Sequence, residues 1–163
     1  EPHFEIRQAR DLEKPLDRLI IPGGESTVMR RLLHDLDLFD TLRARITEGM
    51  PVFGTCAGLI LLAKQVDGGV PCFATMDIAV KRNAYGRQLG SFHTKAEFKD
   101  LGLVPMSFIR APYVESVSDG VEILSVVDDH IVGVRYGNQV AIAFHPELDS
   151  DRKIHQMFLD MIS

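Results

Sequence analysis

Short apolar runs that end in glycine-rich turns stand out in the first third of the chain. Leu19-Ile20-Ile21 leads into Pro22-Gly23-Gly24, and Pro51-Val52-Phe53 leads into Gly54. Apolar runs of this length, bounded by turn residues, are typical of buried strands. The opening segment His3–Arg7 also alternates between apolar and polar residues, which favours a strand there.

Helical spacing follows each of these runs. Val28, Leu32, Leu33 and Leu36 lie on one face of a predicted helix, for which Ser26 or Thr27 is the expected N-cap. A second helix is predicted from Phe39 to Glu48 and ends at Gly49. The apolar stretch from Leu59 to Lys64 predicts a third. Strands that alternate with helices favour a parallel sheet covered on both faces.

The pattern changes after Gly68-Gly69, where most of the chain reads as strands. Asp128-Asp129 and Gly137-Asn138 mark hairpin turns, and the stretch 151–162 predicts a closing helix. The predicted strands cover residues 78–80, 92–98, 106–110, 123–127, 131–136 and 140–144. Residues 1–163 are therefore predicted to form a single α/β domain. It is a three-layer fold with a mostly parallel sheet flanked by helices and a β-rich second half.

Composition narrows the possible functions. The chain has 163 residues, of which 45% are hydrophobic and 25% charged, and its net charge is −5. Without a Lys- or Arg-rich run, a nucleic-acid partner is not expected. No apolar run approaches the roughly 20 residues that span a bilayer, so no membrane association is expected. Two cysteines do not make a disulfide framework, which favours a cytoplasmic protein.

Candidate chemistry centres on Cys56, which lies in the string Gly54-Thr55-Cys56-Ala57-Gly58. This G-x-C-x-G pattern is the thiol counterpart of a nucleophile elbow, in which a strained strand-to-helix turn exposes the reactive side chain. A helix that begins near Ala57 would favour the thiolate, and the Ala57 N–H could bind an oxyanion. A cysteine after a strand is also commonly a core residue, so the pattern alone leaves both interpretations open.

His145 is the histidine best placed by its surroundings to act as a base. It follows the predicted strand 140–144, and Pro146 stiffens the turn that carries Glu147. The two-residue spacing allows Glu147 to fold back onto the imidazole, which would complete a nucleophile, base and orienter. Gly23-Gly24 could turn a second backbone N–H, that of Gly24, toward an oxyanion. The other possibility for Gly23-Gly24 is a tight turn without chemistry. No His or Cys pair has metal-ligand spacing, so neither a metal nor a cofactor is expected.

Five strings together resemble the class I, triad-type glutamine amidotransferases, and more closely the glutaminase subunits of pyridoxal 5′-phosphate synthase. Three of them mark the broad class and two, residues 82–88 and 108–112, mark the vitamin B6 subunit. The strings are Pro22-Gly23-Gly24-Glu25-Ser26-Thr27, Phe53-Gly54-Thr55-Cys56-Ala57-Gly58-Leu59, Arg82-Asn83-Ala84-Tyr85-Gly86-Arg87-Gln88, Phe108-Ile109-Arg110-Ala111-Pro112 and Phe144-His145-Pro146-Glu147.

The resemblance implies a role for each matching position. Cys56 would attack the carboxamide of L-glutamine and form a glutamyl thioester, His145 would move protons, and Glu147 would orient His145. Loop residues that would hold the oxyanion or touch substrate are Gly23, Gly24 and Glu25, and the expected lining of the glutamine pocket is Arg82, Ile109 and Arg110. From the residues alone, surface ion pairs are the simpler interpretation of Arg82 and Arg110.

The resemblance also implies partners and an incomplete N-terminus. Members of this family pass ammonia to a barrel-shaped synthase subunit within a large hetero-oligomer, and the glutaminase is poorly active without it. They begin with a strand and helix, of roughly 20 residues, that this sequence lacks. Because that strand would be central in the sheet, the activity and docking of the 163-residue form are expected to suffer.

Two other functions stay open. A class I glutaminase of another biosynthetic pathway would carry the same three residues, although the string 82–88 favours the vitamin B6 subunit. A non-catalytic interaction domain could also keep this scaffold, although intact Cys56, His145 and Glu147 argue against it.

Overall fold

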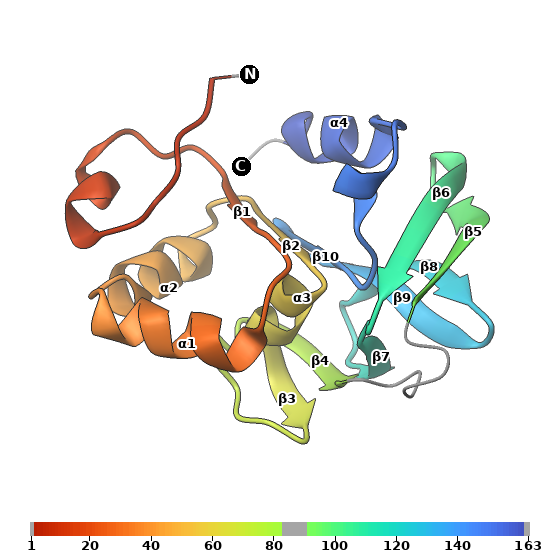
Figure 1. The fold of residues 1–163 in the computed structure, drawn as a ribbon, viewed down its shortest axis with the longest axis horizontal. Coiled ribbons are helices and arrows are strands. Elements are labelled where there is room, and N and C mark those ends of the chain that lie inside the picture. The colour runs from red at the N-terminus through yellow and green to blue at the C-terminus, as the bar shows by residue number, and fades with distance from the viewer. Residues whose placement is uncertain (1, 83–90, 162–163) are drawn as a thin grey trace.

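An eight-stranded sheet forms the centre of the molecule, in a computed structural model that describes residues 2–82 and 91–161 (Figure 1). The strands follow one another across the sheet in the order β1 (Leu19–Ile21), β2 (Val52–Thr55), β10 (Gln139–Ile142), β9 (His130–Tyr136), β7 (Tyr113–Val117), β4 (Met76–Lys81) and β3 (Ala63–Asp67), and β8 (Glu122–Val127) pairs with β9.

Parallel pairing is concentrated where the candidate site lies. Strand β2 pairs in parallel with β1 on one side and with β10 on the other. Strands β3 and β4 are also parallel, whereas the pairs among β10, β9, β8, β7 and β4 are antiparallel. The carboxyl ends of β1, β2 and β10 therefore meet at one edge of the sheet.

Helices cover both faces of this part of the sheet, which confirms the predicted α/β architecture. In Figure 1, α1 (Ser26–Asp35) and α2 (Phe39–Thr47) lie on one side of β1 and β2, and α4 (Lys153–Leu159) lies on the other. The short α3 (Ala57–Leu62) directly follows β2. Two 3-10 helices, η1 (Ala9–Glu13) and η2 (Pro146–Leu148), complete the helical elements of the described residues.

A separate hairpin packs against the β-rich half of the sheet. It consists of β5 (Ser91–Phe98) and β6 (Gly102–Ile109), which pair antiparallel along their whole length. Val104, Met106 and Phe108 alternate with less buried residues along β6, so one face of the hairpin is apolar. Phe108 of that face meets Phe144 at a ring-centroid distance of 5.6 Å, which joins the hairpin to the end of β10.

The core is densest around β2 and β10. Phe53 and the residues Val140–Ile142 have no exposed surface. Phe53 packs on Phe158 of α4, with ring centroids 5.4 Å apart. Full burial of Phe53, Val140 or Ile142 contributes about 1.5–3 kcal/mol each to folding, so the core holds the strands that precede the candidate nucleophile and base.

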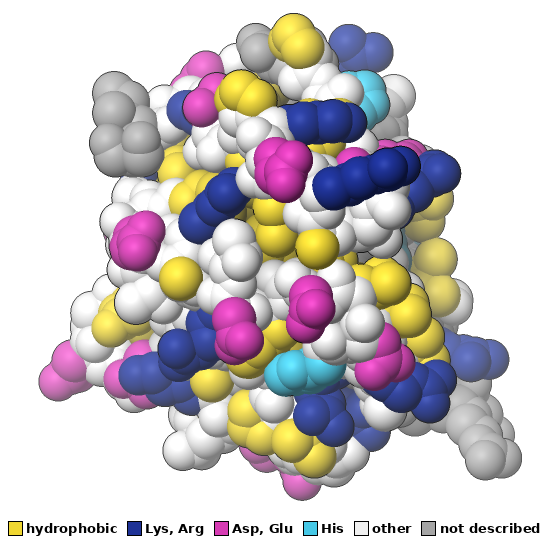
Figure 2. Space-filling view, turned by 90° about the vertical axis from the view of Figure 1, so that its left-hand side faces the viewer, with side chains coloured by type: hydrophobic (Ala, Val, Ile, Leu, Met, Phe, Trp, Pro, Cys, Tyr) yellow, Lys and Arg dark blue, Asp and Glu magenta, His cyan; other side chains and the backbone are white. Residues whose placement is uncertain are grey.

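Helix α1 differs from its prediction in its N-cap residue and in the exposure of its apolar face. Its N-cap is Glu25, whose Oε2 accepts a hydrogen bond of 2.6 Å from the Val28 N–H, so the predicted cap at Ser26 or Thr27 is wrong. The helical spacing is confirmed, but three of its apolar side chains remain exposed, namely Val28, Leu32 and Leu36. Figure 2 shows the side of the molecule that carries α1, where apolar side chains lie between acidic and basic ones.

The prediction of a helix through Lys64 is wrong, because α3 ends at Leu62 and β3 begins at Ala63. The carbonyls of Leu61 and Leu62 accept hydrogen bonds from the N–H groups of Phe73 and Thr75, at 2.9 and 3.0 Å. These bonds replace the next helical turn and direct the chain into pairing with β4. A continuous apolar run carries no period that would distinguish the two structures.

One further prediction of a single element is wrong, and one strand was missed. The segment His3–Arg7 forms no strand, since it pairs with no neighbour among the described residues. Strand β7 was not predicted at all, although it bridges β9 and β4. The closing helix is confirmed as Lys153–Leu159, and Ile162 of its predicted range lies outside the described residues.

Among the described residues, no helix is long and apolar enough to cross a membrane. No group of three or more His, Cys, Asp or Glu side chains in the same residues is placed to hold a metal ion.

Candidate active site

Cys56 occupies the sharp turn between β2 and α3. Its backbone has φ 52° and ψ −101°, a combination that a residue with a side chain adopts only under strain. The Cys56 N–H donates to the Ile142 carbonyl at 2.9 Å, which fixes the turn to the neighbouring strand β10. The turn is therefore the strained elbow that the G-x-C-x-G pattern predicts.

The two glycines that flank Cys56 are required by close backbone approaches. A Cβ at Gly58 would lie 2.3 Å from the Ile21 carbonyl oxygen, and a Cβ at Gly54 would lie 2.7 Å from the Gly58 carbonyl carbon. Both distances are shorter than any Cβ contact tolerates, so α3 can start this close to β1 only with glycine at these positions. The glycines thus bring the elbow against the end of β1.

Burial governs the protonation of the Cys56 thiol. The residue is only 8% exposed, and this burial raises the pKa of the thiol to about 11. The Ala57 N–H lowers the pKa, as expected from the sequence, but its effect is smaller, and the negative charge of Glu147 raises the pKa further. The expectation that the N–H groups at the helix start favour the thiolate is confirmed in direction, but desolvation outweighs the effect of one N–H from a six-residue helix, so the net shift of the pKa is upward.

His145 and Glu147 form a tight pair at the end of β10. The His145 Nδ1 lies 2.6 Å from the Glu147 Oε1. A carboxylate can only accept, so Nδ1 carries the proton and the Nε2 lone pair is left to act as a base. The His145 side chain is 14% exposed and that of Glu147 is 48% exposed, so the imidazole lies inside and the carboxylate lies at the surface.

The loop after β1 packs directly on the imidazole. A Cβ built on Gly23 would lie 2.5 Å from His145 Cε1, so only glycine allows this approach. Gly24 has φ 153°, which also favours glycine. Glu25 is the N-cap of α1, as described above, and its carboxylate is committed to the Val28 N–H. Gly23 and His145, which lie far apart in the sequence, are thus brought together.

Two of the residues expected to line a substrate pocket lie at the end of β6. The Cys56 Sγ is 4.0 Å from the Ile109 carbonyl oxygen. Arg110 follows with a positive φ of 45° and is exposed, together with the Ile109 side chain. This segment is therefore in contact with the nucleophile and exposes the Arg110 side chain, which could meet an anion.

Arg82 has contacts of a different kind. Its guanidinium donates to the Thr27 Oγ1 at 3.2 Å and to the Gly68 carbonyl at 2.5 Å, and its buried Nε has no hydrogen-bond partner among the described residues. It thereby links the end of β4 to the start of α1. The rest of its string, Asn83–Gln88, lies outside the described residues.

Ser107, Asp149 and His93 were not predicted to belong to the site, but the structure places them beside it. The Ser107 carbonyl accepts from the His145 N–H at 2.8 Å, and the Ser107 Oγ donates to the Asp149 Oδ2 at 3.1 Å. His93 Nε2 lies 3.0 Å from the Asp149 Oδ1. These residues come from two strands and a loop, so no motif connects them and only the fold reveals the cluster.

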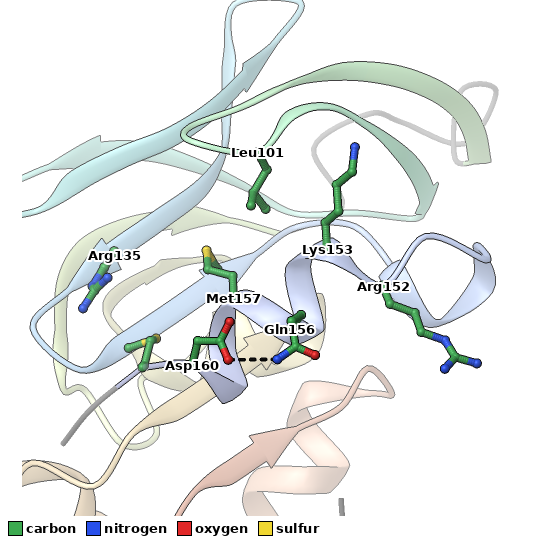
Figure 3. Close-up of a pocket in the computed structure, with 8 residues that line it drawn as sticks. Leu101, Arg135, Arg152, Lys153, Gln156, Met157 and Asp160 are labelled. Carbon is green, nitrogen blue, oxygen red and sulfur yellow. Dashed lines mark hydrogen bonds between the residues drawn. The ribbon is translucent and has the colours of Figure 1, made fainter.

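A large cleft lies beside α4 and does not include Cys56 or His145. Its volume is about 890 Å³, and both apolar and charged side chains line it (Figure 3). The lining residues are Leu101, Arg135, Arg152, Lys153, Gln156, Met157, Asp160 and Met161. The chemistry of Cys56 is therefore not located in this cleft.

The chain is similar to known proteins in sequence and in overall fold. A Desulfitobacterium hafniense protein named "Pyridoxal 5'-phosphate synthase subunit PdxT" is 59% identical over 161 residues, covering 98% of this chain and 81% of that protein. A protein of the same name from Methanocorpusculum labreanum is 55% identical, with coverages of 98% and 85%. A solved structure described as a glutamine amidotransferase superposes with a TM-score of 0.90 at 41% identity, covering 96% of this chain and 84% of the other.

The model of one protein family matches residues 3–163, which is nearly the whole chain. The matched range includes the elbow, the imidazole–carboxylate pair and the glycine loop. The chain belongs to the SNO glutamine amidotransferase family.

Proposed function

We propose that this chain is the glutaminase subunit of a pyridoxal 5′-phosphate synthase and hydrolyses L-glutamine to L-glutamate and ammonia. The observation that carries the proposal is the contact of 2.6 Å between His145 and Glu147 at the end of β10, beside the strand that presents Cys56. The names of relatives at 55–59% identity support the pathway, since they are subunits of pyridoxal 5′-phosphate synthase.

The buried thiol determines how the reaction starts. With a pKa of about 11, Cys56 is protonated at neutral pH in the free protein. Its proton must therefore pass to the His145 Nε2 as sulfur attacks the carboxamide carbon. The imidazolium that forms is stabilised by the Glu147 carboxylate, which is the role of the third member of a triad.

The remaining steps follow from proton balance. His145 returns the proton to the departing nitrogen, ammonia leaves, and a glutamyl thioester remains on Cys56. Water then attacks the thioester with His145 as base, and glutamate leaves while the thiol regains its proton. We assign the binding of the oxyanion to the N–H groups of Ala57 and Gly24. Loss of one such donor typically lowers the rate by roughly 10²–10³.

The substrate contacts belong to the same proposal. We assign the lining of the glutamine pocket to Arg82, Ile109 and Arg110, with Glu25 in the neighbouring loop. Arg110 is exposed beside the Ile109 carbonyl that touches Cys56, so its guanidinium is suited to bind the α-carboxylate of glutamine. Arg82 would have to exchange its bonds to Thr27 and Gly68 to do the same.

The proposal includes the partner and the setting. Ammonia is delivered to the synthase subunit, a barrel protein, within a hetero-oligomer, and residues 1–163 act as one amidotransferase domain. Both cysteines are free in the structure, which suits a reducing cytoplasm.

The direct test is glutamate release measured with and without the synthase subunit. We expect release by the complex, and its loss in Cys56→Ala but not in Cys72→Ala, which removes the other buried thiol. Turnover restored only by an acceptor subunit of another pathway would contradict the vitamin B6 assignment. No turnover with any acceptor would indicate a non-catalytic domain.

A further inference from the structure

We propose that Ser107 and Asp149 are positioning residues that hold the segment His145–Asp149, and with it the base, in register with the nucleophile. The inference rests on the proposed glutaminase function and adds two residues to it. It starts from strand β6, which touches both halves of the candidate active site.

Ser107 is hydrogen-bonded to both ends of the segment His145–Asp149. Its carbonyl accepts from the N–H of His145, and its hydroxyl donates to the carboxylate of Asp149 four residues later, at 2.8 and 3.1 Å. Between these two anchors lie the imidazole and Glu147. A five-residue segment fixed at both ends has little freedom to rotate the imidazole away from Cys56.

Asp149 is fixed in turn by a second strand. Its other carboxylate oxygen lies 3.0 Å from the Nε2 of His93. His93 and Ser107 are direct partners in the β5–β6 register, so their side chains project from the same face of the hairpin. The Asp149 side chain is 14% exposed, and a carboxylate this sheltered makes stronger hydrogen bonds than an exposed one.

The same strand also reaches the nucleophile. Ile109 lies two residues beyond Ser107, and its carbonyl oxygen is 4.0 Å from the Cys56 Sγ. Strand β6 therefore contacts the thiol through one residue and the base segment through another. A displacement of the base segment along β6 would change the geometry between Cys56 and His145 directly.

The segment has few contacts of its own that could replace these anchors. The 3-10 helix η2 has three residues, and its bonds from Leu148 N–H to His145 and from Asp149 N–H to Pro146 are 3.3 and 3.2 Å long. Glu147 is half exposed, and within residues 2–82 and 91–161 its carboxylate bonds only to His145, inside the segment. Removal of the Ser107 hydroxyl should therefore loosen the base without unfolding the protein.

The test is steady-state glutaminase kinetics of the complex with the synthase subunit. We expect Ser107→Ala to lower kcat by roughly 10- to 100-fold while the KM for glutamine stays within about twofold, because positioning affects the transition state and not substrate binding. Ser107→Thr keeps the hydroxyl and should restore kcat. Asp149→Ala, which removes both carboxylate oxygens and thus the bonds to Ser107 and His93, should lower kcat like Ser107→Ala.

A matched control comes from another serine that is bonded to the same hairpin. The Ser125 Oγ donates to the Glu97 carbonyl of β5 at 2.7 Å, and the residue is buried, with 4% of its surface exposed. Ser125→Ala should lower the thermal midpoint and leave kcat unchanged. A wild-type kcat in Ser107→Ala and Asp149→Ala, or no rescue by Ser107→Thr, would overturn the inference alone. An inactive wild-type complex would overturn the proposed function and this inference together.

Discussion

At the scale of single residues, opposing effects act on the Cys56 thiol. Burial raises its pKa to about 11, the Ala57 N–H lowers it, and the Glu147 charge raises it. The same carboxylate that orients His145 therefore also keeps the thiol protonated. The consequence is a nucleophile that is inert on its own and reacts when the base takes its proton.

This balance predicts the pH dependence of Cys56 alkylation. In a Cys72→Ala background, iodoacetamide should modify Cys56 slowly at pH 7, and the rate should rise about tenfold for each pH unit below the pKa, because only the thiolate reacts. Glu147→Gln removes a charge that raises the pKa, so the rate at pH 8 should increase. Mass spectrometry of the modified protein measures both rates. A flat profile between pH 6 and 9, or slower modification of Glu147→Gln, would contradict this account.

The sequence could predict Cys56, His145 and Glu147 because each lies in a local pattern whose geometry follows from a few bonds. The burial of the thiol depends on segments distant in the chain, so the direction of its pKa shift could not be predicted. The contacts of Ser107 and Asp149 are hidden for the same reason, since they join β6 to a loop 42 residues away in the sequence.

At the scale of elements, two glycines have different purposes. Gly58 lets α3 approach the backbone of β1, where a Cβ would lie 2.3 Å from the Ile21 oxygen. Gly23 lets the loop after β1 approach the imidazole, where a Cβ would lie 2.5 Å from Cε1. The first contact is between two backbones and cannot yield, whereas the second is with a side chain that can turn.

The difference predicts that a glycine-to-alanine substitution lowers stability at one position and kcat at the other. Gly58→Ala should lower the free energy of unfolding by about 1–3 kcal/mol, because overpacking outweighs the helix propensity of alanine. Gly23→Ala should displace the imidazole and lower kcat by roughly 10-fold or more, with a smaller change in stability. Urea titration and glutaminase kinetics of both variants, each serving as the control for the other, separate the effects. Wild-type kcat in Gly23→Ala would show that the loop does not determine the position of the base.

Element prediction succeeded where a periodic pattern had a clear end and failed where it did not. Helices α1 and α2 have polar positions that mark their faces, and Gly49 marks the end of the second. The run Leu59–Lys64 has no such marks, and hydrogen bonds from residues 73 and 75 decide where its helix stops. Pairing partners also cannot be deduced from alternation, which explains the missed β7 and the unpaired segment His3–Arg7.

At the scale of the whole molecule, the order of strands assembles the site. Strand β2 lies between β1 and β10, all three run in the same direction, and each is followed by one part of the candidate machinery. Those parts are Gly23-Gly24, Cys56 and His145. The sequence predicted the class of sheet and the parts, but the fold alone shows that β10, from the far end of the chain, is the neighbour of β2.

The most direct test of the central claim is labelling by an electrophilic analogue of glutamine, such as its diazoketone, in the complex with the synthase subunit. Digestion and mass spectrometry then identify the modified residue. The account predicts one adduct, on Cys56, which excess glutamine prevents and which His145→Ala slows. An adduct on Cys72, or a Cys56 adduct that glutamine does not prevent, would contradict it.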